Sequence, residues 1–184
     1  EFYLDPPREG GGGGGGDSDD EETSAIKLSV PNTLQKQLLD EGDRITQGGK
    51  LVPLPRKPSC REIVDAFIDS RGGLDLVEDK MYSELKEGIL RYMNCSVYMV
   101  LLYEEERASH DSMVKAHPGV PLFDLYGGEH LLRLIVTLPA LLRKAEVEQR
   151  SVVAIQPRLQ ELLRFMEKSF NTYFLPEEKY IKAE

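Results

Sequence analysis

Three histidines and two cysteines are the side chains of this sequence best suited to metal binding. His110, His117 and His130 stand seven and thirteen residues apart, and no Asp or Glu completes a helical metal-binding motif around them. Cys60 and Cys95 form neither a Cys-x-x-Cys pair nor a disulfide framework. The sequence therefore predicts no metal site and no cofactor, and it predicts that both cysteines are buried, reduced thiols of an intracellular protein.

Side chains for nucleophilic or acid-base catalysis are not arranged in a recognised motif. The sequence has no Gly-x-Ser-x-Gly elbow and no dinucleotide fingerprint, and its run of glycines lies in an acidic segment that would repel phosphate. Glu104, Glu105 and Glu106 are consecutive, so on a helix their side chains would point about 100° apart, as on a solvated face. No catalytic residue is predicted, although an enzyme with an unrecognised site stays open.

Arg133 interrupts the most apolar stretch of the chain, from Leu131 to Leu138. A guanidinium in such a helix must pair with a carboxylate, reach the surface along its own stem, or face a groove that a partner enters. A glutamate of the 104–106 run is one candidate for the ion pair. The residue pattern leaves structural pairing and partner binding equally open.

Tyr103 and Arg107 are four residues apart, so a helix over 97–107 would place them on one face. Tyrosine and arginine together often anchor protein interfaces. In the alternative interpretation, Tyr103 covers the core and Arg107 is simply solvated.

The elements that must position these side chains lie in a body that follows a tail of different composition. Residues 1–28 contain seven consecutive glycines and eight acidic but only two basic residues, so we expect disorder there. Residues 29–184 carry 21 Lys and Arg against 24 Asp and Glu, which disfavours nucleic-acid binding as the main role. No apolar stretch approaches the ~20 residues needed to cross a membrane. Because the first residue is Glu1 rather than Met, we expect a piece of a longer protein.

The apolar residues of the body recur with helical spacing nearly throughout. Ser59 and Glu62 have the spacing of a capping box, and Pro157 is expected to kink or split the last long helix. The helix from Gly128 is apolar on almost every side and should be central to the core. We therefore expect an all-α fold, a single compact helical domain over 29–184, with helices near 31–47, 59–70, 77–93, 97–107, 128–138 and 148–168.

Several segments, in order along the chain, resemble the MRG domain. The strongest is Leu125-Tyr126-Gly127-Gly128-Glu129-His130-Leu131-Leu132-Arg133-Leu134, which is similar to the Tyr-Gly…His-Leu-Leu-Arg-Leu segment of that family. The others are Val30-Pro31, Leu38-Leu39-Asp40-Glu41, Asp43-Arg44-Ile45-Thr46, Leu54-Pro55, Leu101-Leu102-Tyr103 with Glu106-Arg107, and His117-Pro118. The resemblance covers about residues 27–183.

The resemblance implies a non-enzymatic adaptor of nuclear chromatin proteins of the mortality-factor-like and male-specific-lethal type. Such proteins are subunits of histone acetyltransferase and deacetylase complexes and often carry a chromodomain, which this chain lacks. Their MRG domain binds partner segments of the Phe-x-Leu-Pro type in a shallow hydrophobic groove. By position, the groove here would include Val30, Leu38, Leu39, Gly42, Tyr103, Arg107 and Arg133.

Gly42 departs from the family pattern, which has a Trp between the acidic residues at this point. The loss of a large aromatic side chain removes a potential binding hot spot, so another residue must rebuild the wall or the groove must be wider. Glycine also weakens a helix by about 1 kcal/mol relative to alanine.

The segment from Glu1 to Pro7 loosely resembles a Phe-x-Leu-Pro ligand with one residue inserted, through Phe2, Leu4 and Pro6. It is either a tethered ligand for the groove or the remnant of an upstream domain. Two further alternatives stay open: a helical nucleic-acid-binding module, and a homodimer formed through an exposed apolar groove.

Overall fold

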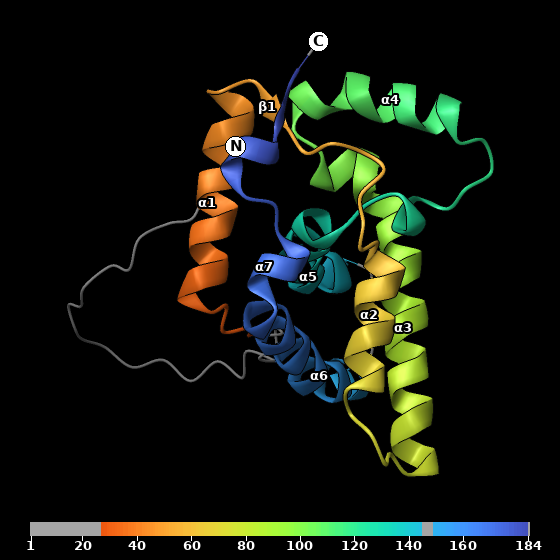
Figure 1. The fold of residues 1–184 in the computed structure, drawn as a ribbon. Coiled ribbons are helices and arrows are strands. Elements are labelled where there is room, and N and C mark those ends of the chain that lie inside the picture. Colours follow the sequence, from red (N-terminus) through yellow and green to blue (C-terminus); the bar gives the residue numbers. More distant parts are fainter. Residues whose placement is uncertain (1–26, 145–148, 184) are drawn as a thin grey trace, which may run out of the picture.

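The computed structural model describes residues 27–144 and 149–183. Within them the chain forms seven α-helices, which confirms the all-α class. Figure 1 shows α5 near the centre, α1 on one side of it, α2 and α3 side by side on the other, and α4 and α6 toward opposite ends of the molecule. The helices are α1 (Asn32–Thr46), α2 (Cys60–Asp69), α3 (Leu76–Ser96), α4 (Arg107–Ala116), α5 (Gly128–Lys144), α6 (Gln149–Lys168) and α7 (Phe170–Tyr173).

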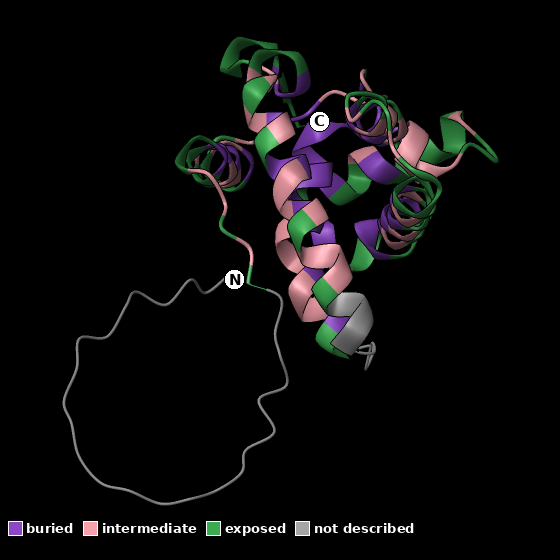
Figure 2. Cartoon of the chain, turned by 90° about the horizontal axis from the view of Figure 1, so that it is seen from below, coloured by how far each residue is buried: buried purple, intermediate pink, exposed green. Residues whose placement is uncertain are grey.

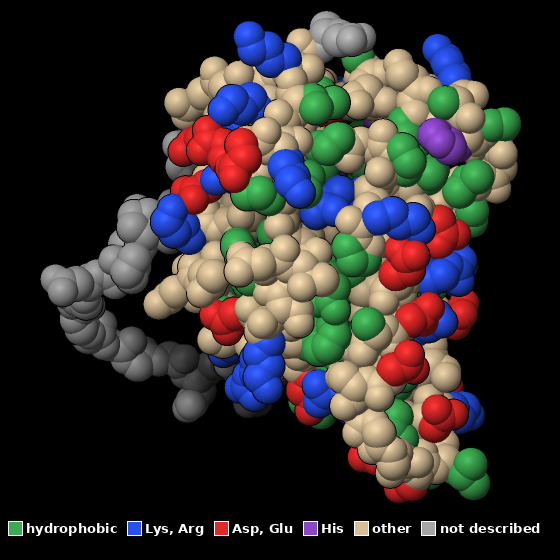
Figure 3. Space-filling view, viewed as in Figure 1, with side chains coloured by type: hydrophobic (Ala, Val, Ile, Leu, Met, Phe, Trp, Pro, Cys, Tyr) green, Lys and Arg blue, Asp and Glu red, His purple; other side chains and the backbone are tan. Residues whose placement is uncertain are grey.

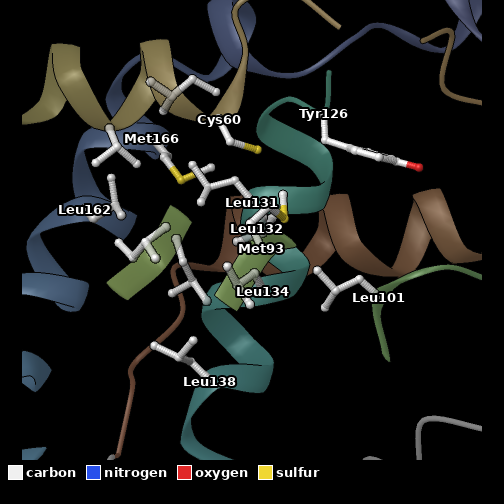
Figure 4. Packing of buried hydrophobic residues seen from close by; sticks show 14 of the residues in the cluster. Cys60, Met93, Leu101, Tyr126, Leu131, Leu132, Leu134, Leu138, Leu162 and Met166 are labelled. Carbon is white, nitrogen blue, oxygen red and sulfur yellow. The ribbon is translucent and has the colours of Figure 1, made fainter. Parts of the chain in front are cut away.

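The predicted central position of α5 is confirmed. Every residue from Gly128 to Ile135 is buried, because the helix is surrounded by neighbouring elements. Figure 4 shows its leucines packed among Met93 of α3 and Leu162 and Met166 of α6, with Leu101 on the other side of α5 in this view. Seen from below in Figure 2, the buried residues lie along the inward sides of the helices and the exposed ones along the outer sides.

Two of the helices begin with capping boxes. Ser59 accepts a hydrogen bond from the amide of Glu62, whose carboxylate accepts one from the amide of Ser59 at 2.6 Å, as the spacing predicts. Asp75 and Glu78 start α3 in the same way. The first turn of α3 extends beyond the core, so Val77 is exposed although Leu85, Ile89 and Met93 further along the helix are buried.

The predicted helix over 97–107 is wrong. After α3 the chain makes a π-helical turn (Val97–Leu101), is extended at Leu102 and Tyr103, and then makes a 3₁₀ turn (Glu104–Glu106) before α4. The carbonyl of Leu101 accepts a hydrogen bond from Arg133 at 2.9 Å, so a tertiary contact competes with continued helix. Tyr103 and Arg107 therefore do not share a helix face.

Three smaller expectations also need correction. Pro157 does not split α6, and α5 continues past Pro139 to Lys144. Prolines on partly exposed sides of a helix leave carbonyls that solvent can satisfy, which explains the tolerance. Cys60 is buried as predicted, but Cys95 is exposed.

The segment preceding α1 and the end of that helix are both tied to the last third of the chain. Gln160 of α6 exchanges two hydrogen bonds with the backbone of Ser29, at 2.9 and 2.6 Å. After α1, strand β1 (Lys50–Leu51) pairs antiparallel with β2 (Ile181–Lys182). Tyr180 is buried, with Arg44 of α1 over its ring at 5.3 Å, as expected for a packed C-terminal segment.

The tail predicted over residues 1–28 lies almost entirely outside the described residues, including the candidate tethered ligand Phe2, Leu4 and Pro6. Leu28 is described, and it packs partly against the core. Among the helices of the described part, none is both long and apolar enough to cross a membrane.

Candidate functional site

Helix α1 turns two different faces toward its surroundings. Its buried stripe consists of Leu34, Gln37, Glu41 and Ile45, at helical spacing. Leu38 is half-buried beside this stripe and packs against the core, whereas Leu39 is 60% exposed. Gly42 lies one turn after both leucines, so these three predicted site residues share one side of the helix.

Tyr103 lies against Gly42. A Cβ atom placed on Gly42 would be 3.0 Å from the Tyr103 hydroxyl oxygen, which is closer than ordinary contact. The tyrosine therefore occupies the space that a side chain at position 42 would need. Burial raises the pKa of Tyr103, with Arg133 opposing the rise, so the phenol is neutral at physiological pH. Tyr103 is therefore the aromatic side chain that lies beside position 42.

Arg133 lies behind Tyr103, with its guanidinium carbon 4.8 Å from the ring centroid. It pairs with two buried carboxylates, those of Glu41 on α1 and Glu106 on the 3₁₀ turn. One Nη1 hydrogen bond goes to Glu106 at 2.6 Å and another to the carbonyl of Leu101. Arg133, which lies on α5, therefore links this helix to α1 through Glu41 and to the 101–106 segment through Leu101 and Glu106.

The charges in this cluster shift each other's protonation. Burial alone would raise the pKa of Glu106, but the positive charge of Arg133 and the interaction with the neighbouring His130 hold it far below its usual range. Burial opposes the charge of Arg133, yet Glu41 and Glu106 raise its pKa above the ordinary value. Glu106 and Arg133 are consequently both ionised at neutral pH, and the cluster is a structural ion-pair network.

A row of aromatic and histidine side chains extends the cluster into the core. His130 Nε2 lies 3.1 Å from Glu106, and its ring contacts Tyr126 with centroids 4.4 Å apart. The Tyr126 hydroxyl lies 2.7 Å from Nδ1 of His110. Two of the three histidines therefore take part in a buried hydrogen-bonded network. In the described part of the chain, no group of three or more His, Cys, Asp and Glu side chains is placed to hold a metal ion.

Arg107 and Val30 lie at the margins of this arrangement. Arg107 is exposed at the start of α4, where its guanidinium carbon is 5.6 Å from the centroid of the Tyr98 ring. Val30 precedes α1 and packs partly against the core, and its carbonyl accepts a hydrogen bond from Gln35 at 2.7 Å. The structure thus gathers Gly42, Tyr103 and Arg133 at one point, with Leu38 and Leu39 on the same side of α1 as Gly42, whereas Arg107 lies over the Tyr98 ring at the start of α4.

Glu41 is the functional neighbour that the sequence interpretation missed. Glu106, one of the two carboxylates that pair with Arg133, belongs to the 104–106 run in which a partner was predicted, whereas Glu41 lies outside that run. Glu41 carries a usable signal, because it lies seven residues after Leu34 and four before Ile45, on the apolar stripe of α1. A carboxylate at a core position requires a buried cation, and Arg133 is that cation.

A bundle of helices around a buried central helix, whose Arg133 pairs with buried carboxylates of two other segments, defines an all-α domain. The chain belongs to the MRG family, whose model matches residues 15–182. The resemblance seen in the sequence is thereby confirmed.

The relatives found by comparison carry names from chromatin biology. The chain is 32% identical over 169 residues to the "NuA4 complex subunit EAF3 homolog" of Dictyostelium discoideum, covering 88% of this chain and 42% of the relative. It is 32% identical to "Protein MRG1" of Arabidopsis thaliana, over 82% of this chain and 47% of the relative. It is 28% identical to human "Mortality factor 4-like protein 2", over 81% and 52% respectively. The chain spans about half the length of these relatives.

Proposed function

We propose that this chain is the recruitment domain of a nuclear chromatin protein. It binds short hydrophobic partner segments of the Phe-x-Leu-Pro type and links its protein to histone acetyltransferase or deacetylase complexes for transcription regulation. Membership of the MRG family supports this role, as do relatives named for chromatin modification and for a NuA4 complex. Recruitment requires binding alone, so no catalytic residue is assigned.

The observation that carries the proposal is the placement of Leu39 beside the Gly42–Tyr103 contact. A leucine this exposed on a helix that otherwise buries its apolar residues provides contact area for a partner. Leu38, Val30 and the Tyr103 ring supply the neighbouring apolar surface. Small grooves of this kind take one or two apolar anchors of a peptide.

Two arginines have different roles in this proposal. Arg133 is a positioning residue, because its guanidinium is buried under the Tyr103 ring and would act on a peptide through that ring. Arg107 is exposed and can register a carbonyl or carboxylate of the peptide at the margin of the groove. Removing Arg133 would leave Glu41 and Glu106 buried without their cation, so its loss would test folding rather than recognition.

Charge gives no support to the nucleic-acid alternative. The body has a slight excess of acidic residues, and on the face drawn in Figure 3 Lys and Arg alternate with Asp and Glu around a band of hydrophobic side chains. Salt-dependent binding to the DNA backbone needs clustered cations.

Isothermal titration calorimetry of the full chain with a Phe-x-Leu-Pro peptide tests the proposal. We expect micromolar binding that Leu39→Ser weakens at least tenfold. Leu76→Ser is the matched control, since Leu76 is an even more exposed leucine on the first turn of α3. Sedimentation should verify a monomer at the concentrations used, because a second copy would compete for the same surface. Equal affinity of both variants, or no binding by the folded wild type, would refute the proposal.

A further inference from the structure

A second concave surface lies away from the proposed groove, between α3, α5 and α6. It is a cavity of about 340 Å³, within the size range of pockets that hold small organic ligands. Most of its lining is apolar, and none of the lining residues belongs to the proposed groove. The lining residues are Met81, Glu84, Leu85, Gly88, Ile89, Tyr92, Leu138, Leu142, Ala154, Ile155 and Arg158.

Gly88 keeps part of this space empty. It lies in the interior of α3, where glycine weakens a helix relative to any ordinary residue. A Cβ atom built on Gly88 would have no other atom within 4 Å, apart from the backbone of its own helix turn and its chain neighbours. No close packing of another element explains the glycine, and a larger side chain at this position would extend into the cavity.

Arg158 supplies a cation to the wall of the cavity. Its Nη1 donates to the carbonyl of Ala154 at 2.8 Å, and its Nη2 reaches only the sulfur of Met81, at 3.4 Å. A thioether is a weak acceptor, and the buried Nε of Arg158 has no acceptor in the described residues. Nε is itself enclosed, so the donors left for an anion are the second N–H groups of Nη1 and Nη2, in the fork geometry that suits a carboxylate.

Two acidic side chains, one on α6 and one lining the cavity, already have partners. Glu161 accepts a hydrogen bond from the Tyr82 hydroxyl at 2.7 Å and lies 3.4 Å from Arg71. Glu84, at the cavity rim, is exposed and lies 3.8 Å from Lys80. The described residues form no ion pair with Arg158, so its positive charge at the wall of an apolar cavity is not neutralised by a carboxylate of this part of the chain.

We propose that this cavity binds a small amphipathic monocarboxylate, with the apolar body among Leu85, Ile89, Leu142 and Ile155 and the carboxylate on Arg158. A single charge matches the single guanidinium, whereas a doubly charged phosphate would bring an uncompensated charge to an apolar wall. The cavity shares no lining residue with the proposed groove, so we expect peptide binding to the groove to be unchanged when the cavity is filled.

The test uses octanoate as the probe and octanol as its uncharged counterpart, each titrated into the full chain and followed by methyl-region NMR spectra. We expect saturable shifts of the Ile89, Leu142 and Ile155 methyl resonances with octanoate, and at least tenfold weaker binding of octanol. Arg158→Gln should weaken octanoate binding at least tenfold and leave octanol binding unchanged, which separates loss of the charge from damage to the cavity.

Substitutions of Gly88 provide the matched pair of variants. Gly88→Leu should abolish octanoate binding by filling the cavity, whereas Gly88→Ala should retain it, and both should raise the unfolding temperature because a helix-interior glycine is removed. The proposal is overturned if octanol binds as tightly as octanoate, if Gly88→Leu still binds, or if octanoate gives no saturable shifts.

Discussion

At the scale of single residues, Arg133 decides how the candidate site is built. The sequence showed that this arginine needed a partner, but the choice between a carboxylate and a groove depended on distances that only the fold provides. Glu106 was within the predicted set, since it belongs to the 104–106 run, while Glu41 comes from a helix more than ninety residues earlier. Long-range pairing of this kind leaves no local pattern, so the cluster could be predicted only in part.

The stability that Glu106 contributes should depend on pH. The folded-state pKa of Glu106 is lowered from 4.5, so the carboxylate contributes in full above that pH and its contribution is lost as the pH falls through the lower folded-state pKa. At pH 7, Glu106→Gln should lower the free energy of unfolding by roughly 3 kcal/mol. Denaturant unfolding from pH 7 to pH 2 should show this difference shrinking once the pH falls below 4.5.

Glu105→Gln is the control, because Glu105 is the exposed neighbour of Glu106. It should change stability little at any pH. A difference for Glu106→Gln that stays constant with pH would contradict the ionic role of the cluster.

The contact between Gly42 and Tyr103 should appear as coupling between the two positions. In a Tyr103→Phe background the hydroxyl is gone, so Gly42→Ala should stabilise the protein by about 1 kcal/mol through helix propensity. With Tyr103 present the same change should gain less, because the hydroxyl must move away from the new methyl group. A double-mutant cycle by denaturant unfolding measures the coupling, and simple additivity would contradict the contact.

At the scale of elements, local signals succeeded where the cause of the structure is local. The capping box at Ser59 depends on neighbouring residues and was predicted correctly. The expected helix over 97–107 failed because Arg133 captures the carbonyl of Leu101 and the chain becomes extended at Tyr103. The predicted split of the last long helix at Pro157 is absent from α6, because a solvated helix face tolerates a missing hydrogen bond.

The capping box of α2 should be measurable as stability. Ser59→Ala removes the side-chain acceptor for the amide of Glu62, and we expect a loss of about 1 kcal/mol in the free energy of unfolding. Ser83→Ala, at an exposed interior position of α3, should be neutral or slightly stabilising. Equal effects of the two substitutions, measured by chemical denaturation, would show that the cap does not stabilise α2.

At the scale of the whole molecule, the body could be predicted from helical periodicity and resemblance, while the role of the tail stays a prediction. The segment from Glu1 to Pro7 is proposed to be a ligand for the helical domain that follows it in the chain. A flexible linker of about 20 residues spans roughly 25 Å on average, so the tail can reach a groove on its own domain.

If the tail competes for the groove, Phe2→Ser in the full chain should raise its affinity for an external Phe-x-Leu-Pro peptide severalfold. The matched control is Tyr3→Ser, because Tyr3 is not part of the ligand-like pattern. Unchanged affinity in calorimetry for Phe2→Ser, with binding otherwise intact, would show that the segment is not a tethered ligand.

The contacts that hold the two ends of α1 can form only after most of the chain has been synthesised. Ser29 hydrogen-bonds to Gln160, which lies 131 residues later in the chain, and β1 pairs with β2, which is synthesised later still. At about 5–20 residues per second, the ribosome needs roughly 7–26 s between making Ser29 and making Gln160. Until then α1 lacks its contact with α6, although α5, against which it also packs, has already been made. The tie at the end of α1 therefore forms only after residues 181–182 have been made.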